Sequence, residues 1–311
     1  MVIILLVIVG LFVWYKEATS PVNIQSQEQM IFAVKKGEGV RSISERLRED
    51  GLVRSPLAFF LTVRFYDIAT KIQAGDFRLS PSMSAIEVAE GLTHGTIDSW
   101  LTIPEGWRNG EIAMRLSEDL GIPEIQFLAL AEEGYMFPDT YLVPNEASSE
   151  AVLAIFKRNF NKKVKEDLAK EIANSPYSLH EIITLASIVE REARLTEDRP
   201  KVASVLLNRL KVGMPLQADA TLQYVKGYDE QTGKWWPVAL SADKEIVSPY
   251  NTYLNSGLPP NPIANPGLAA IKAVLNPANT NYIYYVSESD GVTHFAVTYE
   301  EHLANIERYL R

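Results

Sequence analysis

Glu190 is the residue whose type and position best suit acid–base chemistry. It lies in a segment that begins at Ser178, whose hydroxyl can cap a helix, with Glu181 three residues later as a capping-box partner. Ile183, Ala186 and Glu190 are spaced by three and four residues, which places this carboxylate at the edge of an apolar helix face. Partial burial disfavours the charged form and raises the pKa of a carboxyl group. Glu190 is therefore predicted to be a general acid near neutral pH.

The same spacing allows a simpler interpretation, in which Glu190 is a solvated residue beside an apolar stripe. Arg191 and Arg194 are close enough in the sequence to pair with it, and such a pair would lower its pKa. The residues that follow favour the catalytic interpretation. A second amphipathic helix is predicted over residues 200–212, and a polar stretch at 217–221 comes shortly after it. This polar loop can form one wall of a cleft over Glu190.

Several motifs in one order resemble those of the YceG-like endolytic murein transglycosylases. They cover most of the chain after its N-terminal segment and read EEGYMFPDTY at 132–141, IVERE at 188–192, KVASVLLNRL at 201–210, MPLQADATLQY at 214–224, SPYNTYLNSGLPPNPIANPG at 248–267 and THFAVTYEEH at 293–302. The resemblance implies that the first glutamate of the SIVExE segment, Glu190, is the catalytic acid. One departure is Asn261, which stands in the PPNPI turn where glycine is expected.

The resemblance also implies the reaction. A lytic transglycosylase cleaves the bond between N-acetylmuramic acid and N-acetylglucosamine in peptidoglycan glycan strands, and the muramyl C6 hydroxyl closes a 1,6-anhydro ring. Glu190 would act first as acid and then as base, because the muramyl C6 hydroxyl supplies the nucleophile and no second carboxylate is needed. Its neighbour Glu192 lies on a different face of the helix. No metal and no organic cofactor is needed. The residues expected to bind the substrate are Gln217, Asp219, Thr221, Tyr224, Asn251, Tyr253 and Glu133.

Other interpretations of these residues stay open. A non-catalytic, membrane-anchored wall-binding scaffold would have no use for a raised pKa at Glu190. A hydrolytic muramidase would need a second carboxylate to activate water. Asp219 and Asn251 could equally cap turns.

The composition excludes several classes of protein. The chain has 311 residues, a net charge of −9 and no cysteine. An acidic chain does not favour a nucleic-acid groove, which needs clustered lysine and arginine, so no nucleic acid is expected as a partner. Without cysteine there can be no disulfide, thiolate metal site or cysteine nucleophile. The four histidines show no metal-ligand spacing, and no metal site is predicted.

An apolar N-terminal segment is predicted to place the protein at a membrane. Residues 1–15 are almost entirely apolar and end in Trp14 and Tyr15, aromatic residues that suit a membrane interface. The polar residues 16–29 then form a linker. We expect an uncleaved, single-pass anchor in the cytoplasmic membrane with the catalytic body on the outer side, where the peptidoglycan-synthesis machinery would be a partner. A buried helix is the alternative.

The elements that must position these residues form an α+β chain. Residues 30–97 begin with a strand, two helices and a strand, an order that resembles a LysM-like βααβ module, in which a groove binds N-acetylglucosamine-containing glycans. The alternative is that this part serves only for packing. Residues 98–311 are predicted to be a mixed α+β catalytic domain around the central helical hairpin. A β-hairpin that turns at Asp290 and Gly291, followed by a helix, closes the chain.

Overall fold

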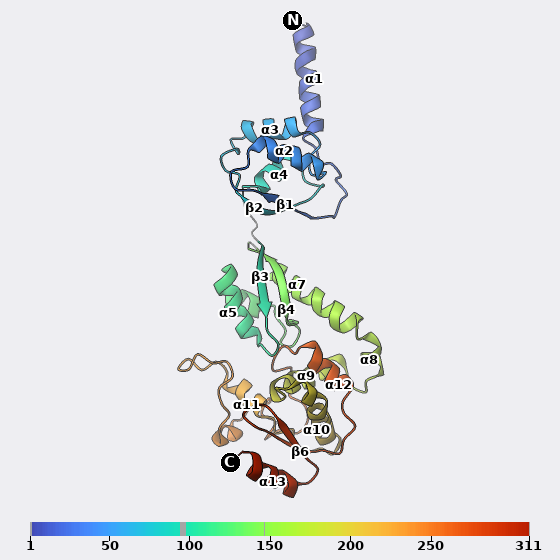
Figure 1. Ribbon diagram of the computed structural model, residues 1–311, viewed down its shortest axis with the longest axis vertical. Helices are drawn as coiled ribbons and strands as arrows, with labels where there is room; N and C mark the ends of the chain where they lie inside the picture. The colour runs from blue at the N-terminus through green and yellow to red at the C-terminus, as the bar shows by residue number, and fades with distance from the viewer. Residues whose placement is uncertain (1, 94–97, 146, 311) are drawn as a thin grey trace. The chain divides into compact units, whose positions relative to one another are not determined.

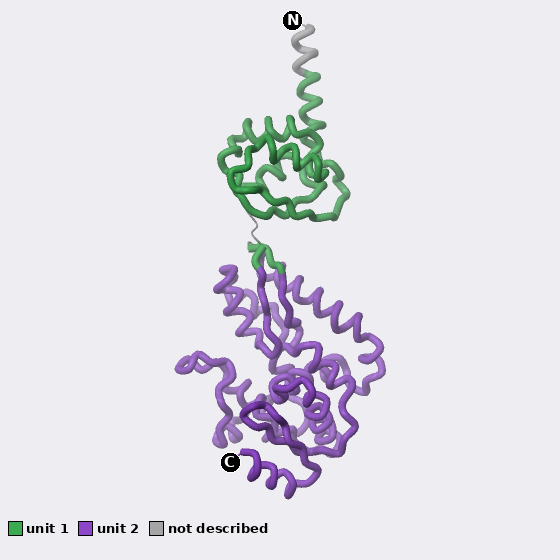
Figure 2. Tube along the Cα trace, viewed as in Figure 1, with its two compact units in different colours: residues 1–99, 142–146 green, residues 100–141, 147–311 purple. Residues whose placement is uncertain are grey.

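The structure is a computed structural model that describes residues 2–93, 98–145 and 147–310. The chain divides into two compact units (Figure 2). Unit 1 comprises residues 1–99 and 142–146, and unit 2 comprises residues 100–141 and 147–311. The predicted domain boundary after residue 97 and the first residue of the predicted anchor lie outside the described residues.

Unit 1 begins with helix α1 (Val2–Ala18) and continues as a small α+β fold (Figure 1). Strand β1 (Met30–Val34) pairs antiparallel with β2 (Gly75–Leu79), and helices α2 (Val40–Glu49) and α3 (Pro56–Phe65) come between them in the chain. This is the β–α–α–β order that the sequence predicts, although its likeness to a LysM module stays a prediction. No helix in the described part of the chain combines the length and the apolar character needed to cross a membrane.

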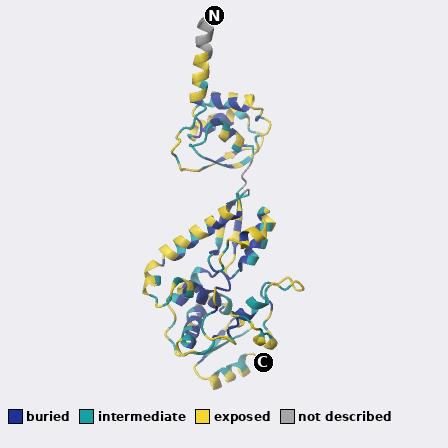
Figure 3. Cartoon of the chain, turned by 180° about the vertical axis from the view of Figure 1, so that it is seen from behind, coloured by how far each residue is buried: buried dark blue, intermediate teal, exposed yellow. Residues whose placement is uncertain are grey.

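The core of unit 1 forms because alternate residues of its strands point inward. Phe32 and Phe77 are opposite each other in the β1–β2 pair, and both are buried. Figure 3 shows buried residues on the helices and strands of this unit. Helix α3 begins after Ser55, whose hydroxyl accepts a hydrogen bond from the backbone N–H of Ala58. Helix α4 (Ala85–Gly91) packs against α3 and β2 and completes the unit.

A strand, a turn and a helix follow where the chain passes from unit 1 into unit 2. Strand β3 (Asp98–Ile103) pairs with β4 (Asp139–Pro144) in a two-stranded sheet, and the division between the units crosses both strands. A turn that contains Gly106 connects β3 to helix α5 (Asn109–Leu120). The short helix α6 (Glu124–Leu128) packs on α5.

The helical region after β4 is interrupted. Helix α7 (Ser149–Phe160) passes into a π-helical turn (Asn161–Glu166) before α8 (Ala169–Asn174). A π turn shifts the register of the helix face for the residues that follow it. Phe160 and Val164, four residues apart, are both buried in the core of unit 2.

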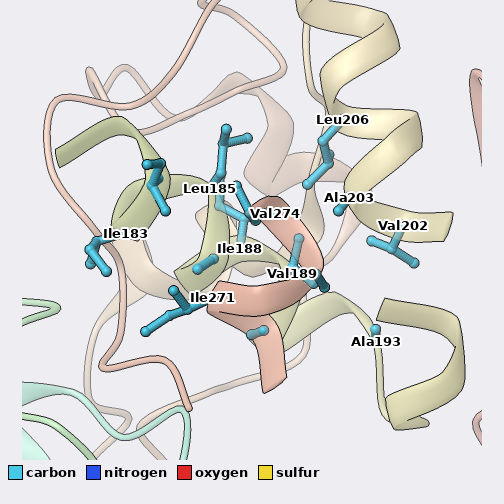
Figure 4. Packing of buried hydrophobic residues seen from close by; sticks show 14 of the residues in the cluster. Ile183, Leu185, Ile188, Val189, Ala193, Val202, Ala203, Leu206, Ile271 and Val274 are labelled. Atoms are coloured by element: carbon cyan, nitrogen blue, oxygen red, sulfur yellow. The ribbon is translucent and has the colours of Figure 1, made fainter. Parts of the chain in front are cut away.

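The centre of unit 2 is the predicted helical hairpin. It consists of α9 (Leu179–Glu192) and α10 (Arg199–Lys211), and α12 (Leu268–Leu275) packs against both (Figure 4). Every residue of α9 from Ile182 to Val189 is buried, so this helix is surrounded by protein rather than covered on one face. A helix enclosed in this way can present side chains in several directions at its C-terminal end.

Smaller elements cover that end of α9. They are 3₁₀ turns at Thr196–Asp198 and Ser241–Glu245, helix α11 (Asp219–Lys226), the hairpin of β5 (Tyr284–Ser287) with β6 (Thr293–Ala296), and helix α13 (Tyr299–Tyr309). The polar stretch predicted to be a loop instead starts helix α11 at Asp219. The mixed α+β class is confirmed.

Candidate active site

A pocket of about 470 Å³ opens at the C-terminal end of α9. Side chains from α9, α10, α11, β5 and α13 contribute to its lining. Its polar groups include Glu192, Arg209, Gln217, Asp219, Tyr253 and Tyr285. Three of the residues predicted to bind substrate, at positions 217, 219 and 253, therefore meet in one hollow beside a glutamate. A pocket with convergent polar groups is the expected form of a catalytic site.

Glu192, the last residue of α9, supplies a carboxyl group to this pocket. Its Oε1 accepts a hydrogen bond from the backbone N–H of Ala220 at 3.0 Å, and its Oε2 accepts one from the hydroxyl of Tyr285 at 2.9 Å. Burial raises the pKa of Glu192 and the nearby charge of Asp219 raises it too, although the two hydrogen bonds and Arg191 oppose the rise. A carboxyl group held in one orientation, with a raised pKa and access to a pocket, can deliver a proton.

Glu190, the predicted catalytic acid, has different surroundings. Its side chain is only 5% exposed, and its Oε1 lies 2.6 Å from Nη2 of Arg199 on α10. Its Oε2 accepts a hydrogen bond from the backbone N–H of Gly267 at 3.0 Å. Burial raises the pKa of Glu190, whereas Arg199 and Gly267 lower it. Both oxygens of Glu190 are thus engaged by donors of the protein, burial outweighs their effect so that the pKa of Glu190 is raised, and Glu190 does not line this pocket. Its role as the catalytic acid stays a prediction.

The helix geometry explains why these two glutamates differ. Residues two positions apart in an α-helix point to different sides, since each residue advances by about 100°. Glu190 therefore faces α10 and the start of α12, while Glu192 faces α11 and β5. The two carboxyl groups are therefore held by different sets of neighbours, and of the two Glu192 lines the pocket.

Glu105 joins the ion pair from the turn after β3. Its Oε2 lies 3.5 Å from Nη1 of Arg199, so the guanidinium group bridges two carboxylates. A Cβ atom at Gly267 would lie 1.9 Å from Oε1 of Glu105, so the Glu105 side chain would have to move to admit a larger residue there. The turn that carries Glu105 is therefore packed close to the start of α12.

The turn before α11 sets the position of Asp219. Gln217 has φ of 49°, a left-handed conformation that is uncommon for a residue other than glycine, and its N–H donates to the carbonyl of Thr252 at 3.0 Å. Such conformations persist where the surroundings fix them, often at functional sites. Asp219 then accepts a hydrogen bond from the hydroxyl of Tyr253 at 2.6 Å. These residues line the pocket as a group.

Thr221 and Asn251, by contrast, are fully buried and are engaged within the protein. The Thr221 hydroxyl donates to the carbonyl of Ala218 at 2.7 Å. The Asn251 amide donates to the carbonyls of Lys244 and Ile246 at 3.0 and 2.8 Å. These hydrogen bonds fix the turns next to the pocket, and the binding role predicted for both residues stays a prediction.

Glu133 and Tyr224 lie in a second polar cluster and do not line the pocket. Glu133 accepts hydrogen bonds from the N–H of Asn109 at 2.9 Å and from the side-chain amide of Asn265 at 3.2 Å. Burial raises the pKa of Glu133 to about 8. The ring of Tyr224 has the guanidinium of Arg108 4.4 Å from its centroid. Both residues thus lie in this buried network, and their predicted binding role stays a prediction.

Trp236 is the centre of that second cluster. The guanidinium groups of Arg108 and Arg191 lie 4.3 and 3.9 Å from its ring centroid, and its indole N–H donates to Glu111 at 3.1 Å. A ring engaged by two cations is not a free platform for a sugar. Arg191 also lines the pocket, so the cluster adjoins the site and adds positive charge near it.

Arg209 and Tyr285 are pocket residues that the sequence reasoning missed. Nε and Nη1 of Arg209 each donate to a backbone carbonyl at 2.7 Å, those of Ile283 and Leu216. The guanidinium is therefore held at the pocket by the main chain, and burial lowers the pKa of Arg209. The one signal in the sequence was a charged residue in the otherwise apolar VLLNRL segment of α10. Among the described residues, no group of three or more His, Asp or Glu side chains is placed to hold a metal ion.

Comparison with known proteins finds one matching family and several related proteins. The sequence model of the YceG-like family matches residues 32–308. An endolytic murein transglycosylase of Bacillus subtilis (strain 168) is 31% identical over 338 residues, which cover 98% of this chain and 91% of that protein. An endolytic murein transglycosylase of Streptococcus pneumoniae serotype 2 is 27% identical, and the chain spans 60% of its length.

A solved structure shares the fold. The crystal structure of a YceG-like protein from Listeria monocytogenes superposes with a TM-score of 0.59 at 27% sequence identity. The match covers 90% of this chain and 99% of that one.

Proposed function

This chain belongs to the YceG-like family, and on that premise we propose that it is an endolytic murein transglycosylase, an enzyme that cuts the glycan strands of peptidoglycan. The related proteins from Bacillus subtilis and Streptococcus pneumoniae are named endolytic murein transglycosylases, which supports this class of reaction. The pocket at the end of α9 supports a site for it, because it combines a carboxyl group of raised pKa with polar groups that can bind sugar hydroxyls.

We assign the acid and base roles to Glu192. The protonated carboxyl gives its proton to the glycosidic oxygen between N-acetylmuramic acid and N-acetylglucosamine, and the bond from that oxygen to C1 breaks. The C6 hydroxyl of the same muramyl ring then attacks C1, and the Glu192 carboxylate takes the hydroxyl proton. The product is a 1,6-anhydro end, and the enzyme returns to its starting protonation state. An intramolecular nucleophile of this kind has a high effective concentration.

The observation that carries this assignment is the contrast between the two glutamates. Burial raises the pKa of both carboxyl groups, but Glu190 is paired directly with Arg199, a cation that opposes the rise. Glu192 accepts hydrogen bonds from the neutral Ala220 and Tyr285, and nearby Asp219 adds to its rise while Arg191 opposes it. Glu192 also lines the pocket, as a proton donor must.

A hydrolytic muramidase is the second candidate, and one observation favours it. Asp219 brings another carboxylate to the same pocket, where it could activate a water molecule. Its Oδ1 is, however, engaged by the hydroxyl of Tyr253. We therefore give Asp219 the role of stabilising positive charge on the sugar ring.

Mass analysis of the products distinguishes these candidates. Purified glycan strands digested by the protein should end in anhydro sugars, which are lighter by one water than the reducing ends that a hydrolase leaves. Fragments of several disaccharides, rather than single disaccharides, are expected from an endolytic enzyme. Reducing ends would assign the reaction to hydrolysis through Asp219, and intact strands would favour a non-catalytic scaffold.

We propose that the β–α–α–β part of unit 1 binds glycan weakly, as its resemblance to a LysM module implies. Joining a weak glycan-binding site to the catalytic unit raises the effective concentration of the glycan strand at the catalytic site. A variant that lacks residues 30–93 should therefore lose activity on long strands more than on short ones. Equal rates on both kinds of strand, relative to the full chain, would make this part merely structural.

We also propose that α1 anchors the chain in the cytoplasmic membrane with both units outside. Val9 and the residues 11–14 of this helix are exposed apolar side chains, and its apolar character supports the proposal. Protease added to intact spheroplasts should digest the body of the protein. Full protection from protease would contradict this orientation. A protein anchored there would act on strands close to the machinery that synthesises them.

A further inference from the structure

Helix α3 of unit 1 is apolar on its outer side as well as its inner side. Its inner residues, such as Phe59 and Val63, are buried in the core. Its outer residues Leu57, Leu61 and Phe65 are spaced by four, and they are 58%, 42% and 82% exposed. A surface helix normally presents polar side chains to water. Three large exposed apolar side chains in one row mark a surface that is covered by something else.

The outer side of α3 is joined to α1. The hydroxyl of Tyr15 is hydrogen-bonded to that of Thr62 at 2.8 Å, which fixes the end of α1 against α3. A hollow of about 490 Å³ lies between them, lined by Tyr15, Leu61, Arg64, Phe65 and Tyr66. Figure 1 shows α3 at the end of unit 1 from which α1 leaves. The apolar surface of α3 is therefore continuous with the exposed apolar side chains of α1.

The residue types around this hollow indicate what covers it. Trp14, Tyr15 and Tyr66 are aromatic residues with a polar atom, the kind that gathers where a bilayer meets water. Lys16 and Arg64 are cations on the same part of the unit, and long cationic side chains can reach lipid phosphates while their stems stay against apolar groups. A protein partner would not require this ordering of apolar, aromatic and cationic residues.

We propose that the outer face of α3, formed by Leu57, Leu61, Phe65 and Tyr66, lies in the headgroup region of a phospholipid bilayer, with Arg64 at the level of the lipid phosphates. The helix would then lie in the interface as amphipathic helices do. This inference rests on the proposed anchor α1 and not on the glycan-cleaving activity. Its consequence is that the α+β part of unit 1 contacts the membrane surface, in addition to its covalent connection to α1.

Single-cysteine labelling tests the proposal cleanly, because the chain has no cysteine of its own. The full chain carrying Phe65→Cys is labelled with an environment-sensitive fluorophore and reconstituted into vesicles of phosphatidylcholine and phosphatidylglycerol. The matched control is Ile31→Cys, which replaces an apolar residue that is 63% exposed but lies on β1. Thermal unfolding of both variants checks that the fold is kept.

The expected result is a blue-shifted emission at position 65 that is lost when the vesicles contain nitroxide-labelled lipid, with neither effect at position 31. Equal quenching at the two positions, or none at either, would overturn the proposal. A blue shift at position 65 that lipid nitroxides do not quench, and that grows with protein concentration, would show that a second copy of the chain covers the face. Failure of the chain to float with vesicles would reject both this inference and the anchor, while glycan cleavage would be unaffected.

Discussion

Replacing Glu192 with glutamine is expected to lower the rate of glycan cleavage by roughly 10²–10⁴-fold, the usual contribution of general acid–base catalysis. Glutamine can accept the hydrogen bond from the N–H of Ala220 through its amide oxygen and donate from its amide nitrogen to the hydroxyl oxygen of Tyr285, so the pocket should keep its shape. It has no proton to transfer at its oxygen. The rate of release of anhydro-ended fragments from purified strands measures the effect, and binding of uncleaved strands should persist.

Glu190→Gln is the matched control two residues away. We expect its activity per folded molecule to stay within a few-fold of the wild type, because Glu190 is turned toward Arg199 and away from the pocket. Full activity in Glu192→Gln together with strong loss in Glu190→Gln would return the acid role to Glu190. The raised pKa of Glu192 adds a second readout: activity should fall as the pH rises through that pKa, since the protonated form is the donor.

The Arg199→Ala variant is expected to be less stable than the wild type by about 3–5 kcal/mol, the cost of leaving one member of a buried ion pair without its partner. The side chains of Arg199 and Glu190 are 8% and 5% exposed, so water cannot replace the lost contact. Chemical denaturation at neutral pH measures the loss. A change of only a few tenths of a kcal/mol would mean that the pair is a surface-like contact that contributes little.

The pH dependence of this variant follows from the sign of the shift. Burial already raises the pKa of Glu190, and removal of Arg199 removes a contribution that lowers it. A carboxyl group with a raised folded-state pKa favours the folded state only at low pH, and that benefit is lost as the pH rises. The loss in free energy of unfolding caused by Arg199→Ala should therefore be small under acidic conditions, where Glu190 is protonated in both the folded and the unfolded state. It should grow toward neutral pH. Adding Glu190→Gln to this variant should recover part of the lost stability.

The elements that the sequence predicted correctly are those fixed by local signals. Ser55 and Ser178 begin their helices because a hydroxyl satisfies a free N–H of the first turn, a preference visible within four residues. The closing hairpin follows from two short strands around Asp290 and Gly291. The π turn after α7 was not predictable, since it depends on how Phe160 and Val164 meet a core built from distant segments.

The surroundings of the two glutamates could not be predicted from the helix alone. Glu190 and Glu192 both border the apolar stripe of α9, and their partners come from α10 on one side and from α11 and β5 on the other. Those partners are brought in by long-range folding. For the same reason a motif does not show that Asn251 and Thr221 are buried and hydrogen-bonded within the protein.

The Glu190–Arg199 pair also has a kinetic consequence for the residue two positions further on. The last turn of a helix ordinarily frays, since its carbonyls lack partners and its backbone opens at little cost. Glu192 is the last residue of α9, where fraying would leave its carboxyl group without a fixed position. The buried pair and the hydrogen bond to Gly267 secure that turn on the side away from the pocket. The carboxyl group of Glu192, the proposed proton donor, is thus held between turnovers from two sides, by this pair and by Ala220 and Tyr285, and we expect either anchor alone to keep it ordered.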